Sequence, residues 1–397
     1  MALLGGPRPA LAQATFLLRD INPGSAASNP SSIVVMNQVA YFAASDPVNG
    51  NELWRSDGTS AGTYLVADIR LGSGSSMPLG LAVMGDRLYF RADDGTHGIE
   101  LWSSDGTEAG TALVRDISSG PSHSMPAYLT PAGTSLFLQA CESSHGCELW
   151  KSDGTAGGTV MVKDINPGTA SSSPWGLAAF LDGILFVGTT VASGSEPWRS
   201  DGTMAGTVMV RDINPGWASS GPGWAFPGAF LTSLDGKVYF AANDGVLGRE
   251  MWATDGTSVG TALVADVNPG FGSSNPGPPA VVGGAVYFQA YEPVLGAELW
   301  RSDGTPGGSS RVLDLNPGAY SSYPQLLTQS GGSLYFRGGE RFIYGDELRR
   351  TDGTAAGTIC VKDIAPGYLS DGAPESLLDV DGALFFQILD AARASYE

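Results

Sequence analysis

Acidic residues recur along this 397-residue chain at a spacing that could serve metal binding or acid–base chemistry. The stretch Glu52-Leu-Trp-Arg-Ser-Asp-Gly-Thr59 returns six more times, with its Glu at positions 100, 148, 196, 250, 298 and 347. One carboxylate per Asp-Gly turn is too few for a Ca²⁺ shell, which needs about six to eight oxygens. A glycosidase needs one particular carboxylate pair, so a Glu in every repeat favours a recurrent hydrogen bond or ion pair.

Two of the three histidines are candidate metal ligands. His97 and His145 occupy equivalent loop positions in adjacent repeats, where Asp93, Asp94 or Glu142 could complete a two-His site. Neither an HExxH nor a CxxC spacing supports such a site, and no nucleophile elbow or phosphate loop appears. The sequence therefore predicts no catalytic residue, no metal site and no cofactor, with Ca²⁺ as the remaining alternative.

The spacing of the motif sets the architecture. Successive copies lie 48, 48, 48, 54, 48 and 49 residues apart, and each repeat contains four short segments of strand length separated by Gly, Asp or Asn. Four strands in about 48 residues correspond to one blade of a β-propeller. The fold predicted is therefore all-β, with a single propeller over residues 15–397 built from ~48-residue repeats.

The blade number depends on how the segments are counted. The fourth-segment and second-segment patterns each occur eight times, but the Glu-Leu-Trp pattern occurs only seven times. The chain opens on a lone fourth segment, Thr15–Ile21, which predicts eight four-stranded blades closed by N-terminal strand exchange. Seven blades are the alternative. A further alternative is that the chain is a fragment that is cut at Glu397, inside an eighth Glu-Leu-Trp motif.

The repeated residues have structural roles that the sequence predicts directly. Asp-Gly between the third and fourth segments is a hairpin signal, because Gly accepts positive φ and Asp caps backbone N–H groups. The Trp of each motif is expected to pack between neighbouring sheets. Arg349 replaces the seventh Trp, which predicts a less well packed seventh blade. The seven copies resemble the bacterial ELWxxDGT repeat family, whose members are secreted or surface proteins, some labelled hyalin-like; Glu196-Pro-Trp, Glu250-Met-Trp and Glu347-Leu-Arg depart from it.

The N-terminus and the cysteines indicate a compartment. Residues 1–14 end in Ala12-Gln-Ala14, the pattern of a signal-peptide cleavage site, so we interpret them as a residual leader. Cys141 and Cys147 bracket one loop and replace Asp93 and Ile99 of the preceding repeat, which predicts a disulfide in an oxidising compartment. Two free thiols are the alternative. Cys360 is expected to be a buried apolar side chain, and the localisation predicted is secreted or cell-surface.

The formal net charge of −19 restricts the partners. It would repel nucleic acid and anionic membranes, and no segment approaches the roughly 18–20 apolar residues of a transmembrane helix. We expect a monomer whose partner is a glycan or a protein.

Aromatic residues outside the repeat are the best candidates for a binding site. The largest insertion follows Gly216 and contains Trp217, Trp224 and Phe226, and Trp175 occurs at a similar place one repeat earlier. Such rings could form a platform on the propeller face where the loops after the second and fourth strands meet. They could also merely cover the core.

Three functions follow from these observations. The first is a non-enzymatic binding or adhesion module, with the four aromatic residues contacting the ligand. The second is a glycosidase or lyase with a carboxylate pair in the central channel. The third is a structural spacer of a larger surface protein.

Overall fold

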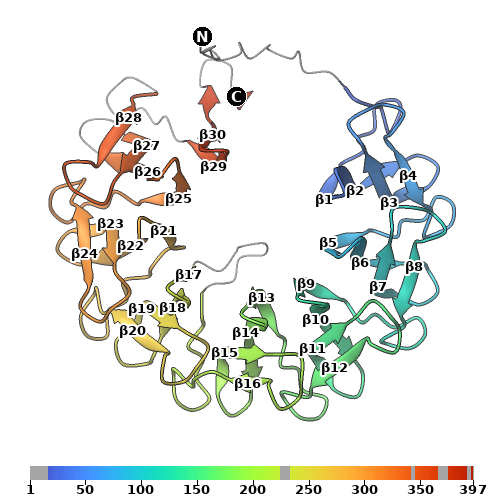
Figure 1. Cartoon of the computed structure of the whole chain (residues 1–397), viewed down its shortest axis with the longest axis horizontal. Coiled ribbons are helices and arrows are strands. Elements are labelled where there is room, and N and C mark those ends of the chain that lie inside the picture. The colour runs from blue at the N-terminus through green and yellow to red at the C-terminus, as the bar shows by residue number, and fades with distance from the viewer. Residues whose placement is uncertain (1–16, 224–232, 341–344, 365–373, 391–394, 397) are drawn as a thin grey trace, which may run out of the picture. The chain divides into compact units, whose positions relative to one another are not determined.

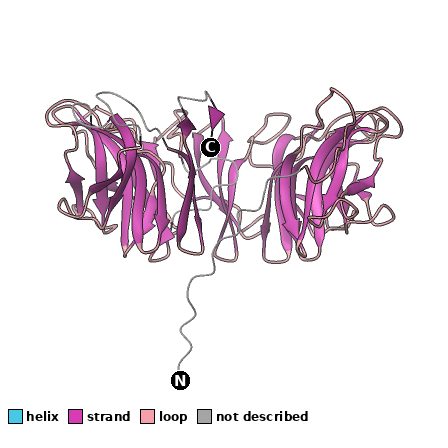
Figure 2. Ribbon diagram, turned by 90° about the horizontal axis from the view of Figure 1, so that it is seen from above, coloured by secondary structure: helices cyan, strands magenta, loops and turns pink. Residues whose placement is uncertain are grey.

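The computed structural model describes residues 17–223, 233–340, 345–364, 374–390 and 395–396. Within these ranges the chain forms strands, turns and loops (Figure 2). These ranges contain no helix that is long and apolar enough to cross a membrane. The chain divides into two compact units, residues 1–129 with 154–156 and residues 130–153 with 157–397.

The repeating element is a four-stranded antiparallel sheet in which the strands lie in sequence order (Figure 1). The described residues form seven such sheets, here called blades 1 to 7. The second and third strands of each blade are the most buried, because they carry the aromatic pair and the Glu-Leu-Trp triplet. The predicted all-β propeller fold is confirmed.

The first unit contains blades 1 and 2. Blade 1 consists of β1 (Ser31–Met36), β2 (Val39–Asp46), β3 (Gly50–Ser56) and β4 (Tyr64–Ala67). Blade 2 consists of β5 (Leu79–Met84), β6 (Arg87–Asp93), β7 (Ile99–Ser104) and β8 (Ala112–Arg115).

The second unit contains most of blade 3 and all of blades 4 to 7. Blade 3 consists of β9 (Ala127–Ala132), β10 (Ser135–Glu142), β11 (Gly146–Ser152) and β12 (Val160–Lys163), and blade 4 of β13 (Trp175–Phe180), β14 (Gly183–Thr190), β15 (Gly194–Ser200) and β16 (Val208–Met209). Blade 5 consists of β17 (Ser233–Leu234), β18 (Lys237–Asn243), β19 (Arg249–Thr254) and β20 (Ala262–Ala265), and blade 6 of β21 (Ala280–Val282), β22 (Ala285–Glu292), β23 (Gly296–Ser302) and β24 (Ser309–Leu313). Blade 7 consists of β25 (Gln325–Ser330), β26 (Ser333–Glu340), β27 (Gly345–Thr351) and β28 (Ile359–Lys362).

The end of the chain forms two smaller sheets. β29 (Glu375–Val380) pairs with β30 (Ala383–Gln387), and β31 (Leu389–Asp390) pairs with β32 (Ser395–Tyr396). β29 and β30 come from the eighth copy of the first and second segments.

The core lies in the seams between successive blades. In the first unit, Trp102 of blade 2 packs against Val66 and Ile69, which belong to the end of blade 1. In the second unit, Trp300 of blade 6 packs in the same way against Val264 of blade 5. The predicted role of the motif Trp as an inter-sheet packing residue is therefore confirmed.

The N-terminal segment contacts blade 1 without forming the strand that the sequence predicts. Leu17–Ile21 are described and belong to no strand, whereas Thr15 lies outside the described residues. The segment is held by side chains instead: Arg19 donates a hydrogen bond to the carbonyl of Thr63, and Ile21 packs on the core of blade 1. Its closure of a ring by strand exchange stays a prediction.

These contacts repeat those that fourth strands make elsewhere. In the second unit, Lys163 donates to the carbonyl of Thr207 at 2.8 Å, and Arg211 to that of Thr261 at 2.5 Å. Arg19 is the equivalent of Lys163 and Arg211. The N-terminal segment therefore covers blade 1 as the fourth strand of a preceding blade would.

Candidate functional site

The recurring Glu of the motif is a buried structural acceptor. In blade 1, the Glu52 carboxylate accepts hydrogen bonds from the backbone N–H groups of Ile69 at 3.1 Å and Ser76 at 2.8 Å, and from the Ser76 hydroxyl at 2.5 Å. Glu196 of blade 4 makes the same three bonds, to Ile213 and Ser220. The expected hydrogen-bond role is confirmed. Each carboxylate ties the segment that leaves the fourth strand to the third strand of its own blade.

Burial raises the pKa of these carboxyls, although their hydrogen bonds oppose it. For Glu298 the pKa rises to about 7, with burial as the main cause and the Ser322 hydroxyl as the largest opposing effect. A raised pKa can mark a general acid. However, the Glu298 side chain has no exposed surface, so a substrate could not reach it.

The Asp of the motif is a turn cap, as predicted. Asp57 Oδ1 accepts hydrogen bonds from the backbone N–H and the hydroxyl of Thr59, at 2.9 and 2.7 Å. These bonds lower the pKa of the Asp57 carboxyl. The same cap forms at Asp201 and Asp255, so the motif carboxylates serve local structure.

The histidines are engaged within their own turns. His97 Nδ1 lies 2.7 Å from the Asp94 carboxylate, and His145 Nδ1 lies 2.5 Å from that of Glu142. Across the ranges that the structure describes, no group of three or more His, Cys, Asp or Glu side chains could hold a metal ion.

The predicted disulfide is present. Cys141 at the end of β10 and Cys147 in β11 are directly opposite in the antiparallel pairing, and their sulfur atoms are bonded. Cys360 in β28 is free and half-buried, so it is more accessible than the sequence suggested.

Two kinds of loop meet on one side of each blade. The exit segment is the stretch that follows the fourth strand. It is hydrogen-bonded to the third strand of its own blade and to the second strand of the next blade. In blade 4, Ser219 of the exit segment accepts from Ser195 at the start of β15 at 2.9 Å, and Ser220 accepts from Asn243 at the end of β18 in blade 5 at the same distance. The turn between the second and third strands of blade 5 therefore lies next to the exit segment of blade 4.

The next seams repeat this arrangement. Ser274 of the blade 5 exit segment accepts from the backbone of Tyr291 in blade 6 at 2.8 Å, and Ser322 of blade 6 accepts from Gly339 in blade 7 at 2.8 Å. Turn and exit segment consequently alternate along blades 4, 5 and 6.

Large apolar side chains are exposed at the tips of these loops. The exit segments present Trp217 at 85% exposure, Phe271 at 86% and Tyr320 at 45%. The intervening turns present exposed valines. Together the six residues form what we call the apolar arc: Val191, Trp217, Val246, Phe271, Val294 and Tyr320. In the first unit, Val48 occupies the position of Val246 and Val294 in blade 1 and is also exposed.

Of the four aromatic residues predicted to bind ligand, the structure describes Trp175 and Trp217. Trp217 is exposed on the arc. Trp175 begins β13, is half-buried and packs on the core between blades 4 and 5, beside Trp252. Trp224 and Phe226 lie outside the described residues. Of the two described residues, Trp217 is the one in a position open to a partner. The ligand-binding role of all four stays a prediction.

Phe271 and Tyr320 were not singled out from the sequence. Each follows the Asn-Pro-Gly turn that ends a fourth strand, as Trp217 does. A large apolar residue just after a tight polar turn cannot easily be buried, and this signal would have identified them.

The comparisons with known proteins identify no relative. No described protein family and no curated protein matches the chain. Among solved structures, the computationally designed Ika8 protein aligns over 93% of this chain and 95% of its own, with a TM-score of 0.42 and 13% identity. Oligopeptidase B from Leishmania major aligns over 84% of this chain with a TM-score of 0.45 and 11% identity, and a prolyl endopeptidase over 84% with 0.43 and 11%. The chain spans about half the length of these two peptidases.

Proposed function

We propose that the chain is a secreted or cell-surface binding module without catalytic activity, which holds a protein or glycan ligand on the apolar arc. The observation that carries this proposal is the exposure of Trp217, Phe271 and Tyr320 on successive blades. Large apolar side chains that gather on one side of a soluble protein often mark a site of partner contact.

The composition of the arc favours a protein ligand. Aromatic residues are enriched in protein interfaces, where they bury a large area at a small cost in conformational entropy. The valines between them offer no hydrogen-bonding group, which a sugar ring would require. A glycan stacked on the three rings is the alternative within the same proposal.

Location and family belong to the same proposal. The Cys141–Cys147 disulfide supports an oxidising compartment, since disulfides persist in secreted and surface proteins. The ELWxxDGT resemblance supports the same location, and the charge of −19 disfavours nucleic acid as a partner. We expect the module to act as a monomer.

A double substitution, Trp217→Ala with Phe271→Ala, tests the site. Peptide and glycan arrays probed with the wild-type chain should identify a ligand, and the double variant should bind it at least tenfold more weakly. Both side chains are largely exposed, so the melting temperature should stay within about 2 °C of the wild-type value.

Val259→Ala is the matched control. Val259 is 95% exposed but lies on the turn between the third and fourth strands of blade 5, away from the arc loops. It should bind like the wild type. Undiminished binding by the double variant would refute the proposed site.

A further inference from the structure

One seam of the second unit lacks the indole that fills the others. Trp198 is buried between blades 3 and 4 and Trp252 between blades 4 and 5, and Trp300 is half-buried between blades 5 and 6. The equivalent residue in blade 7 is Arg349 in β27, opposite Cys360 in β28.

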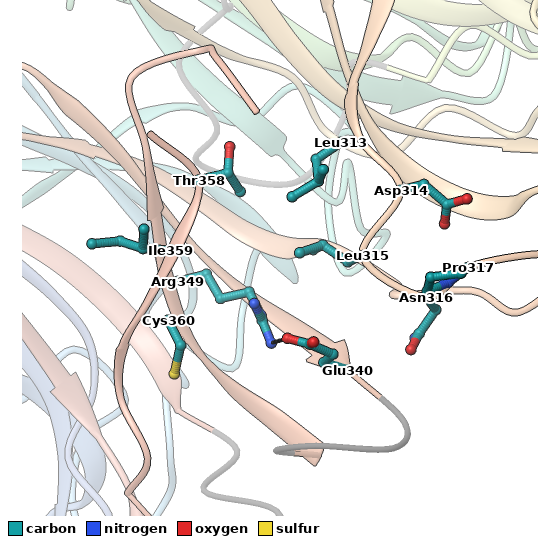
Figure 3. A pocket seen from close by; sticks show the side chains of 10 residues that line it. All are labelled: Leu313, Asp314, Leu315, Asn316, Pro317, Glu340, Arg349, Thr358, Ile359 and Cys360. Atoms are coloured by element: carbon teal, nitrogen blue, oxygen red, sulfur yellow. Dashed lines mark hydrogen bonds and ion pairs between the residues drawn. The ribbon is translucent and has the colours of Figure 1, made fainter. Parts of the chain in front are cut away.

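A cavity of about 610 Å³ lies at this seam (Figure 3). Leu313, Leu315 and Pro317 line it from the end of blade 6, and Ile359 and Cys360 from β28 of blade 7. This volume is within the roughly 300–1,000 Å³ typical of small-molecule sites. The expected packing defect in blade 7 is therefore confirmed.

The neighbouring blade shows how the space arises. In blade 6, Arg311 of the fourth strand forms an ion pair with Glu292 at 2.8 Å, while Trp300 directly opposite it fills the seam. In blade 7 the same ion pair is made from the third strand, by Arg349 and Glu340 at 2.8 Å. The fourth strand of blade 7 has Cys360 at the position of Arg311. Compared with blade 6, blade 7 therefore keeps the Arg–Glu ion pair but lacks the indole.

Arg349 is held in place at the wall of the cavity. It is 2% exposed, and its Nε donates to the carbonyl of Gly338 at 2.9 Å, in addition to the ion pair with Glu340. A guanidinium fixed in this way can stack on an aromatic ring.

Cations do accompany the indoles of other seams. Lys163 Nζ lies 5.9 Å from the ring centre of Trp198, and the Arg211 guanidinium lies 5.7 Å from that of Trp252. These distances are in the range of cation–π attraction. The seam between blades 6 and 7 has a buried cation and apolar walls, and its rings, Tyr287 and Phe336, lie in the packed core and not at the position of the motif Trp.

We propose that this seam is a binding site for a planar aromatic ring that is neutral or positively charged, such as an indole. The ring would occupy the space that a motif Trp fills elsewhere, between Leu313 and Ile359 and against Arg349. Asp314 and Glu340 at the cavity disfavour an anionic ligand, because Arg349, the cation among the described lining residues, is already paired with Glu340. The site is independent of the apolar arc.

Titration calorimetry with indole, tryptamine and indole-3-acetate tests the proposal. Indole and tryptamine should bind the wild-type chain, and the anionic indole-3-acetate should bind at least tenfold more weakly. N-acetyl-tryptophan amide distinguishes a peptide-borne ring from a free small molecule: if it binds as well as indole, the site accepts a side chain of a polypeptide.

Arg349→Trp restores the motif and should fill the cavity, so binding of indole should fall at least tenfold. Val259→Trp adds an exposed Trp elsewhere and should leave binding unchanged. Cys360→Leu places in the cavity the residue found at Leu65, Leu113 and Leu263, and it decides the question if Arg349→Trp does not fold.

The reactivity of the Cys360 thiol reports directly on whether the cavity is occupied. Indole should slow the alkylation of Cys360 by iodoacetamide at least threefold in the wild-type chain. No binding of indole or tryptamine, or undiminished binding by both cavity-filling variants, would overturn the proposal.

Discussion

At the scale of single residues, the repeated motif positions side chains for structure. Gly304 illustrates this in the Asp-Gly turn of blade 6. Its φ is +82°, and a Cβ there would overlap the hydroxyl oxygen of Tyr239 in blade 5. The glycine therefore allows both the turn and the close approach of the neighbouring blade.

The pair Gly304→Ala and Gly307→Ala separates these two effects. Gly307 has the same φ of +82°, but nothing lies within 4 Å of an added Cβ. We expect Gly307→Ala to lower the free energy of unfolding by about 1 kcal/mol, the cost of the left-handed backbone. Gly304→Ala should cost a further ~1–3 kcal/mol because of the steric overlap. Urea denaturation measures both, and equal losses would contradict the role of the Tyr239 contact.

At the scale of the elements, a blade contacts mainly the blades that precede and follow it in the sequence. Substitutions in one hairpin should therefore leave the more distant blades unchanged. The β10–β11 hairpin is the example with a covalent link. Cys141 and Cys147 replace noncovalent pairs that other blades use at the same place, such as Ser45 and Asn51 of blade 1, whose side chains are hydrogen-bonded at 3.0 Å.

Removing the disulfide should destabilise the hairpin modestly. With Cys141→Ser and Cys147→Ser together, we expect the free energy of unfolding to fall by roughly 2 kcal/mol, since the closed loop is short. Cys360→Ser is the control and should change it by well under 1 kcal/mol. Differential scanning calorimetry with and without reductant checks the result: the wild type should lose stability on reduction, and the double variant should not.

At the scale of the whole molecule, repeated buried carboxyls make stability depend on pH. Burial raises the pKa of the Glu298 carboxyl from its ordinary value of 4.5 to about 7, and it raises the pKa values of Glu52, Glu100, Glu148, Glu196 and Glu250 as well. A raised carboxyl pKa means that the folded state binds the proton more tightly. Its stabilising effect is complete below about pH 4.5 and is lost as the pH rises through the folded-state value.

The chain should therefore be more stable at pH 5 than at pH 8. For Glu298 the difference is at most roughly 3 kcal/mol. Glu298→Gln should flatten the dependence, whereas the exposed Glu108→Gln should not. Chemical denaturation across this range measures the slopes. A wild-type stability that rises between pH 5 and pH 8 would contradict the pKa direction.

The sequence by itself determined the blade. The recurring Asp-Gly turns, the strand-length segments and the period of about 48 residues depend on local backbone preference and on a repeated apolar pattern, and both can be read from neighbouring positions. The same local signals predicted the disulfide and the structural roles of Glu52 and Asp57.

Tertiary structure decided which aromatic side chains are open to a partner. Trp175 and Trp217 look alike in the sequence, yet the first packs beside Trp252 and the second is exposed on an exit segment. Likewise, Arg349 breaks the Trp series visibly, but the cavity beside it also depends on Cys360, which lies opposite Arg349 on the neighbouring strand. Exposure and cavities depend on what the next strand and the next blade supply, and a local pattern does not contain that information.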